Sequence, residues 1–206
     1  MPHKIMLSDI SQPLIFLRHG ETVWNRQDRY QGRINTHLTA SGIEQAKGHA
    51  DTLNNAFQHG WVDRDRARII CSPFNRARET AGIVATTLGA PELSIEQDDR
   101  LREITMGRWE GLTNMEVKSA FHAERKSRKS DRWHFAPKGG ESLADRVGGV
   151  RDALADLEAH SIVITHAGIL RIILHLLGGM ERQEAAGSAI AHQGGYRFSN
   201  AGLMAI

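Results

Sequence analysis

The sequence predicts an α/β fold in which a mainly parallel sheet lies between helical layers. Three short, continuously apolar runs, at residues 14–17, 67–71 and 161–165, have the character of parallel strands buried on both faces. Stretches with the 3.6-residue period of amphipathic helices separate these runs along the chain. Because strands that alternate with helices form βαβ units with right-handed crossovers, we expect such units to build one sheet.

Four helices are expected, in chain order. The first begins at the candidate N-cap Thr39 and carries Ile43, Ala46, Ala50 and Leu53 on one face. The second follows Ser72-Pro73 and ends at Gly89, a residue typical of helix C-termini. The third spans about 142–158, and the fourth, at about 169–177, is almost wholly apolar, which suits a central position.

Residues 118–140 differ from the rest of the chain in being strongly basic. We expect a helix plus a loop, inserted over one rim of the domain. The charges fit either a solvated face or a lid that contacts substrate, since charge runs usually face solvent. Trp133 and Phe135 in this segment, together with Trp109, are candidates to stack on a substrate ring.

Length and composition predict a single domain spanning residues 1–206. The hydrophobic content of 40% and charged content of 24% are ordinary, and a net charge of +2 does not indicate nucleic-acid binding. No apolar run is long enough to cross a membrane, and residues 1–12 lack the features of a secretory signal, so we expect a cytoplasmic protein. The single cysteine, Cys71, is expected to be inert core. Nothing in the pattern predicts an oligomeric state.

Arg18-His19-Gly20 directly follows the first predicted strand. Open α/β sheets bind ligands at the carboxyl ends of their strands. The guanidinium fork of arginine matches phosphate geometry, and an imidazole can form a covalent intermediate. We therefore interpret His19 as a candidate nucleophile and Arg18 as a candidate phosphate ligand.

The ends of the other two predicted strands carry matching residues. Arg76 lies near the first turn of the helix after Pro73, where backbone N–H groups and the helix dipole favour anions. His166 follows the third strand and precedes Ala167 and Gly168, which are small enough to let backbone approach a ligand. Arg76 is thus a second candidate clamp, and His166 a second imidazole on the same phosphoryl group, with Ala167 beside the substrate.

An irregular loop at residues 101–111 supplies the candidate general acid. Glu103 is positioned to protonate a leaving oxygen and then to activate water, and Glu110 is a competing candidate. Asn25, Gln31 and Gly32 offer an amide or a flexible backbone for substrate binding, or they are turn residues without ligand contact.

The motifs FLRHGETVWN, YQGRINTHLTASG, SPFNRARETA, LREITMGRWEG, GGES and THAGILR, in this order over residues 14–173, resemble the histidine phosphatase superfamily, phosphoglycerate-mutase-like branch. The resemblance implies an α/β/α sandwich and nucleophilic attack by His19. It also implies a phosphate pocket of Arg18, Arg76 and His166, with Glu103 as proton donor and neither metal nor cofactor.

Residues 106–111, MGRWEG, are similar to the Gly-x-Trp-Glu-Gly of the phosphatase subtype. We therefore expect a metal-independent phosphomonoesterase that acts through a phosphohistidine on a small phosphorylated metabolite. Sugar phosphates, nucleotide-derived phosphates and cofactor precursors such as α-ribazole phosphate all fit this expectation. Phosphoglycerate mutase-type phosphoryl transfer and a non-catalytic phospho-ligand binding module are the alternatives. A metal hydrolase is disfavoured, because the eleven histidines form neither His-x-x-x-His nor His-Glu-x-x-His. Asn35 departs from the resemblance, since many relatives carry aspartate there.

Overall fold

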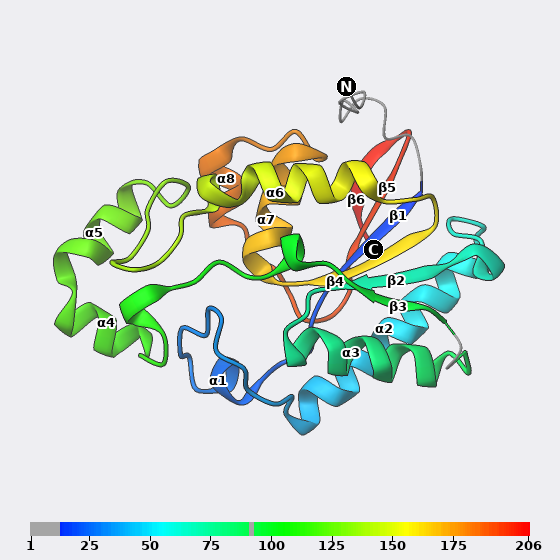
Figure 1. Cartoon of the computed structure of the whole chain (residues 1–206), viewed down its shortest axis with the longest axis horizontal. Helices are drawn as coiled ribbons and strands as arrows, with labels where there is room; N and C mark the ends of the chain where they lie inside the picture. Colours follow the sequence, from blue (N-terminus) through cyan, green and yellow to red (C-terminus); the bar gives the residue numbers. More distant parts are fainter. Residues whose placement is uncertain (1–12, 91–92) are drawn as a thin grey trace.

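The computed structural model describes residues 13–90 and 93–206, which form a six-stranded sheet in the order β3-β2-β4-β1-β5-β6 (Figure 1). The strands are β1 (Leu14–Arg18), β2 (Arg68–Cys71), β3 (Ile95–Gln97), β4 (Ser161–Thr165), β5 (Tyr196–Ser199) and β6 (Gly202–Ala205). The first four strands run parallel, whereas β5 and β6 are antiparallel to their neighbours. The predicted α/β class with a mainly parallel sheet is confirmed, and the three predicted strands form its centre.

Helices cover both faces of the sheet (Figure 1). They are α1 (Val23–Arg26), α2 (Ala40–Gln58), α3 (Asn75–Thr87), α4 (Asn114–Ala120), α5 (His122–Ser130), α6 (Leu143–Asp156), α7 (Ala167–Leu176) and α8 (Arg182–Gly187). Helices α2 and α3 pack on one face, and α6, α7 and α8 pack on the other. The three-layer arrangement is therefore present.

The side chains of β1 alternate between the two cores. Leu14 and Phe16 pack among residues of α6 and α7, whereas Ile15 and Leu17 pack among residues of α2 and α3. All four are fully buried. A strand buried on both faces has no polar side, which is why the sequence shows a continuous apolar run there rather than an alternation.

Capping residues fix where the predicted helices begin. The Thr39 side chain accepts a hydrogen bond from the Gly42 N–H at the start of α2, as predicted, and Ser142 forms a capping box at the start of α6. One detail is wrong: Ile43 is 38% exposed. The buried face of α2 instead carries Gly42, Ala46, Ala50 and Leu53.

The basic segment holds one helix, α5, followed by a loop, as expected, whereas α4 lies mostly before it and ends at Ala120. Both helices lie to one side of the sheet (Figure 1). The segment is anchored at its end by Trp133, whose ring is buried in the core beside α7 and makes an edge contact with His175. Within the described residues, no helix combines the length and the apolarity that a membrane crossing requires. The prediction made for residues 1–12 concerns a part of the chain outside those described.

Candidate active site

The carboxyl ends of β1, β2 and β4 meet at one edge of the sheet because these strands are parallel and adjacent. The backbone N–H of His19 donates to the Thr165 carbonyl at 3.0 Å, and that of Ser72 donates to the Ile164 carbonyl at 3.1 Å. These bonds extend the strand pairing by one residue. They bring His19, Ser72 and His166 together although the three are far apart in sequence.

His19 is held with one ring nitrogen engaged. Its Nδ1 lies 2.8 Å from the carbonyl oxygen of Gly20, and because a carbonyl can only accept, Nδ1 carries the proton. Nε2 therefore holds the lone pair, and it makes none of the hydrogen bonds found among the described residues. The imidazole is buried, with its ring centroid 5.1 Å from that of His166. This tautomer leaves the Nε2 lone pair available, as a candidate nucleophile requires.

The charges around His19 keep its ring neutral. Burial lowers the pKa of His19 well below its usual range, and the nearby Arg76 and Arg18 guanidinium groups lower it further. Burial also lowers the pKa of Arg18 to about 10 and that of Arg76 to about 10. Both arginines therefore remain cations near neutral pH. Two buried positive charges beside a neutral nucleophile favour binding of an anion.

Arg76 and His166 are bonded to each other. Arg76 Nε donates to His166 Nδ1 at 3.1 Å, and its other two nitrogens donate to the Ile34 and Gly32 carbonyls. His166 Nε2 in turn lies 2.7 Å from Ser72 Oγ. Both nitrogens of His166 are thus occupied, and this imidazole orients Arg76. Contact of His166 with a phosphoryl group stays a prediction.

Glu103 lies in the same pocket, against the start of α7. Its Oε2 accepts a hydrogen bond from the Gly168 N–H at 3.0 Å, and its Oε1 accepts one from the Ile104 N–H at 3.0 Å. The negative charge of Glu103 acts on Arg18 and Arg76, the same cations that act on His19. The candidate acid, nucleophile and clamps are thus gathered at one point.

Comparison with known proteins agrees with this geometry. Residues 14–196 match the family model described as the histidine phosphatase superfamily (branch 1). The chain belongs to the histidine phosphatase superfamily. A glucosyl-3-phosphoglycerate phosphatase of Mycolicibacterium vanbaalenii is 38% identical over 133 residues, which cover 64% of this chain and 53% of that protein. A metal-independent phosphoserine phosphatase of Arabidopsis thaliana is 34% identical over 172 residues, covering 78% and 66%.

Among solved structures, a mycobacterial glucosyl-3-phosphoglycerate phosphatase in complex with VO3 has a TM-score of 0.75 at 26% identity, covering 91% of each chain. A putative α-ribazole-5′-P phosphatase from Escherichia coli has a TM-score of 0.76 at 25% identity, and 95% of each chain is covered. The chain spans between about half and two thirds of the length of the curated relatives it matches first.

The other predicted site residues make contacts within the protein, and their contact with substrate stays a prediction. Gln31 is buried, accepts from the Thr22 hydroxyl and donates to Ile34 and Thr36. Asn25 caps α1 through Thr22. The Gly32 carbonyl accepts from Arg76, as described above. Ala167 is the first residue of α7, next to His166.

Glu110, the competing candidate acid, serves as a tether. Its Oε1 accepts hydrogen bonds from the Thr105 hydroxyl at 2.7 Å, the Met106 N–H at 3.0 Å and the Arg33 N–H at 3.1 Å. These bonds join the loop that carries Glu103 to the loop whose Gly32 carbonyl holds Arg76. We therefore keep Glu103 as the candidate acid.

The expected aromatic stacking on substrate is wrong for two of its three residues. Trp109 is fully buried, with its Nε1 donating to Glu124, and Trp133 is 2% exposed. Neither indole is free to meet a ligand. Phe135 is partly buried and packs at an interplanar angle of 35° against Trp109, and stacking of its ring on a substrate stays a prediction.

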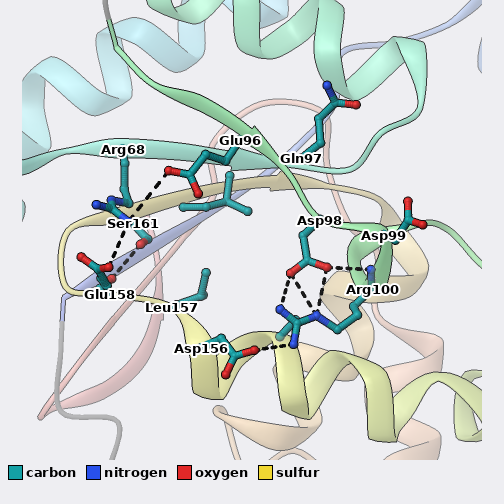
Figure 2. A pocket seen from close by; sticks show the side chains of 12 residues that line it. Arg68, Glu96, Gln97, Asp98, Asp99, Arg100, Asp156, Leu157, Glu158 and Ser161 are labelled. Atoms are coloured by element: carbon teal, nitrogen blue, oxygen red, sulfur yellow. Dashed lines mark hydrogen bonds and ion pairs between the residues drawn. The ribbon is translucent and has the colours of Figure 1, made fainter.

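A hollow of about 520 Å³ lies away from this site, beside the starts of β2 and β4 (Figure 2). Its cations are already neutralised: Arg100 pairs with Asp98 and Asp156, and Arg68 pairs with Glu158 (Figure 2). Among the described residues, no three His, Cys, Asp or Glu side chains come together in a way that could hold a metal ion.

Three further residues of the site were not predicted. Ser72 bonds His166, and the Thr80 hydroxyl accepts from the Gly20 N–H at 3.1 Å. His192 contacts the nucleophile from the loop before β5, with ring centroids 5.6 Å apart. Ser72 and Thr80 stand in a motif that the sequence did single out, whereas His192 lies beyond it, before a strand whose short mixed sequence gave no signal.

Proposed function

We propose that this protein is a phosphomonoesterase that transfers the phosphoryl group of a small phosphorylated metabolite to His19 and then to water. The observation that carries the proposal is the state of His19. The ring is neutral, its Nδ1 is tied to the Gly20 carbonyl, and the lone pair on Nε2 shares a buried pocket with two arginines. A nucleophile and its anion-binding cations are therefore already arranged before substrate arrives.

In the first step, Nε2 of His19 attacks phosphorus while the bond from phosphorus to the alcohol oxygen breaks. Glu103, in its protonated form, gives its proton to the departing oxygen, so that the alcohol leaves neutral. Arg18 and Arg76 balance the charge on the equatorial oxygens, which is the main contribution of such sites to phosphoryl transfer. His166 holds the Arg76 guanidinium in place through Nε.

In the second step, a water molecule attacks the phosphohistidine and the bond from phosphorus to Nε2 breaks. Glu103, now a carboxylate, takes a proton from that water. Inorganic phosphate leaves, and His19 returns to its starting tautomer. No residue of the scheme needs a metal ion, and the name of the Arabidopsis relative describes a metal-independent enzyme.

The proposed substrate is a phosphomonoester of a small metabolite. The named relatives act on glucosyl-3-phosphoglycerate and phosphoserine, so these two compounds and α-ribazole 5′-phosphate form the first panel to assay. A single domain and a cytoplasmic location stay predictions from the composition.

Trapping of the intermediate tests the proposal. Protein quenched during turnover of a ³²P-labelled monoester should carry acid-labile, base-stable phosphate on His19, located by mass spectrometry. His19→Ala should carry none, whereas His122→Ala, a change at an exposed histidine of α5, should label like wild type. Phosphate release without any labelled His19 would refute the covalent route. Labelled protein that passes its phosphoryl group to an added phosphoglycerate more readily than to water would indicate a mutase, and absence of both labelling and turnover would indicate a binding module.

A further inference from the structure

Three consecutive backbone carbonyls at the end of β1 each receive a hydrogen bond from an imidazole ring. The Arg18 carbonyl lies 2.8 Å from His49 Nε2, and the His19 carbonyl lies 2.7 Å from His192 Nδ1. The Gly20 carbonyl lies 2.8 Å from Nδ1 of His19 itself. Since carbonyl oxygens only accept, all three ring nitrogens act as N–H donors.

These bonds give the backbone carbonyls partners where strand β1 ends, at Arg18. Past that residue the chain leaves the sheet, yet His19 and Gly20 remain buried, where unpaired backbone groups are costly. The His19 N–H still donates to Thr165, and the Gly20 N–H donates to Thr80. With the three imidazoles, every backbone donor of His19 and Gly20 and every carbonyl from Arg18 to Gly20 has a partner.

His49 is the inner brace. It lies on α2, is fully buried, and its Nδ1 has no hydrogen-bond partner among the described residues. Its bond to the Arg18 carbonyl is the single hydrogen bond that its ring makes within that part of the chain. The helix that carries His49 also brings Gly42 against Gly20, so α2 holds the motif at two places.

His192 is the outer brace. It comes from the loop between α8 and β5, and its ring meets that of His19 nearly edge-on, at an interplanar angle of 64°. A lysine or arginine in its place would add charge beside the phosphoryl site, and a carboxylate would repel the substrate. Burial and the Arg18 charge lower the pKa of His192 to about 4. The neutral ring therefore donates a hydrogen bond from Nδ1 to the carbonyl and adds no charge to the site.

We propose that His192 is a positioning residue that fixes the direction of His19 Nε2 through the His19 backbone, with His49 supporting it from behind. The inference rests on the proposed function, because it assigns His192 a part in phosphoryl transfer to His19. If it holds, loss of the bond slows attack without weakening phosphate binding, since Arg18 and Arg76 keep their own partners.

The experiment compares His192→Ala with His192→Asn. The amide nitrogen of asparagine can stand where Nδ1 of histidine does, so His192→Asn retains a donor that His192→Ala lacks. Rapid-quench measurement of His19 phosphorylation is the main readout. We expect His192→Ala to slow this step by about 10- to 100-fold, because a displacement of the reacting nitrogen by about 1 Å has an effect of that size. His192→Asn should restore most of the rate. His49→Gln and His49→Leu make the same comparison for the inner brace.

Two ligands separate positioning from a general loss of structure. Inorganic phosphate reports on the arginines, whereas vanadate, which adopts the trigonal bipyramidal geometry of the transition state, reports on Nε2 as well. We expect His192→Ala to weaken vanadate about as much as it slows phosphorylation while leaving phosphate affinity within about threefold. His175→Ala is the matched control, because that partly buried ring also bonds a backbone carbonyl, that of Met180, but lies away from His19.

Two kinetic results would each overturn the inference: phosphorylation of His192→Ala at the wild-type rate, or phosphorylation of His192→Asn as slow as that of His192→Ala. Equal weakening of phosphate and vanadate would also overturn it, since it would mean that the pocket as a whole had changed. Failure of the proposed function looks different, because wild-type protein itself would then give no phosphohistidine.

Discussion

A single methyl group added at Gly168 should lower the activity without lowering the stability of the fold. Gly168 is the second residue of α7, and its N–H donates to Glu103 Oε2 at 3.0 Å. A Cβ added at Gly168 would lie 3.1 Å from the Glu103 carboxyl carbon, 3.3 Å from Oε2 and closer still to Oε1. Non-bonded atoms pack at about 3.5–4.0 Å, so the carboxylate must move by roughly 1 Å.

This shift should cost activity while the fold is retained. The clash is with the mobile end of a side chain, and alanine favours a helix over glycine by about 1 kcal/mol. We therefore expect Gly168→Ala to melt no lower than wild type. Displacement of a catalytic group by about 1 Å costs on the order of 100-fold, so kcat on an alkyl phosphate should fall by about that factor.

The leaving group supplies the specific test. An alkyl alcohol needs the Glu103 proton, whereas p-nitrophenolate leaves without it, so the phosphorylation step should slow far more for the alkyl ester. Gly148→Ala in α6, where an added Cβ meets nothing within 4 Å, is the control for the helix effect and should keep wild-type kcat. Equal losses on both esters, or wild-type kcat in Gly168→Ala, would show that Glu103 is not the proton donor.

Three further outcomes follow from the site. Arg76→Gln should raise the pKa of His19 toward its usual value, because the Arg76 cation helps to lower it; an unchanged NMR titration of the His19 ring would contradict this. Glu110→Ala should lower the free energy of unfolding by about 1–3 kcal/mol, measured in urea, since three donors lose their acceptor. Glu103→Gln should be inactive, because an amide cannot supply the proton. Exhaustive chelation with EDTA should leave turnover unchanged, and recovery of lost activity by zinc or magnesium would exclude the metal-free scheme.

The central strands were predictable because burial on both faces leaves a strong signal. Residues 14–17, 67–71 and 161–165 have one property, continuous apolarity, that few other structures produce. The strands at the sheet edges lack it. All of β3 is exposed, and in β5 a single residue, Phe198, is buried. Without a prediction of these strands, nothing indicated that the loop before β5 returns to His19.

Arg18, His19, Arg76 and Glu103 could be singled out because each residue type is tied to one chemistry, and the structure brings the four together. Their catalytic roles stay predictions. The site was not predictable where the same residue type can face inward or outward. The amide of Gln31 is of a type that binds phosphate, yet its hydrogen bonds are to Thr22, Ile34 and Thr36. Hydrogen-bond partners that are distant in sequence decided this outcome.

In the proposed scheme, the surroundings of His19 also protect the nucleophile. Burial lowers the pKa of His19, and Arg76 and Arg18 lower it further, so mild acid leaves its lone pair available, and protonation of His19 does not compete with substrate binding in that range. The acid side of the kcat/KM profile should therefore follow the second ionisation of the substrate, near about pH 6, rather than His19. A profile that shifts with the pKa of the chosen ester would support this, and one that stays fixed across esters would assign the acid limb to the protein.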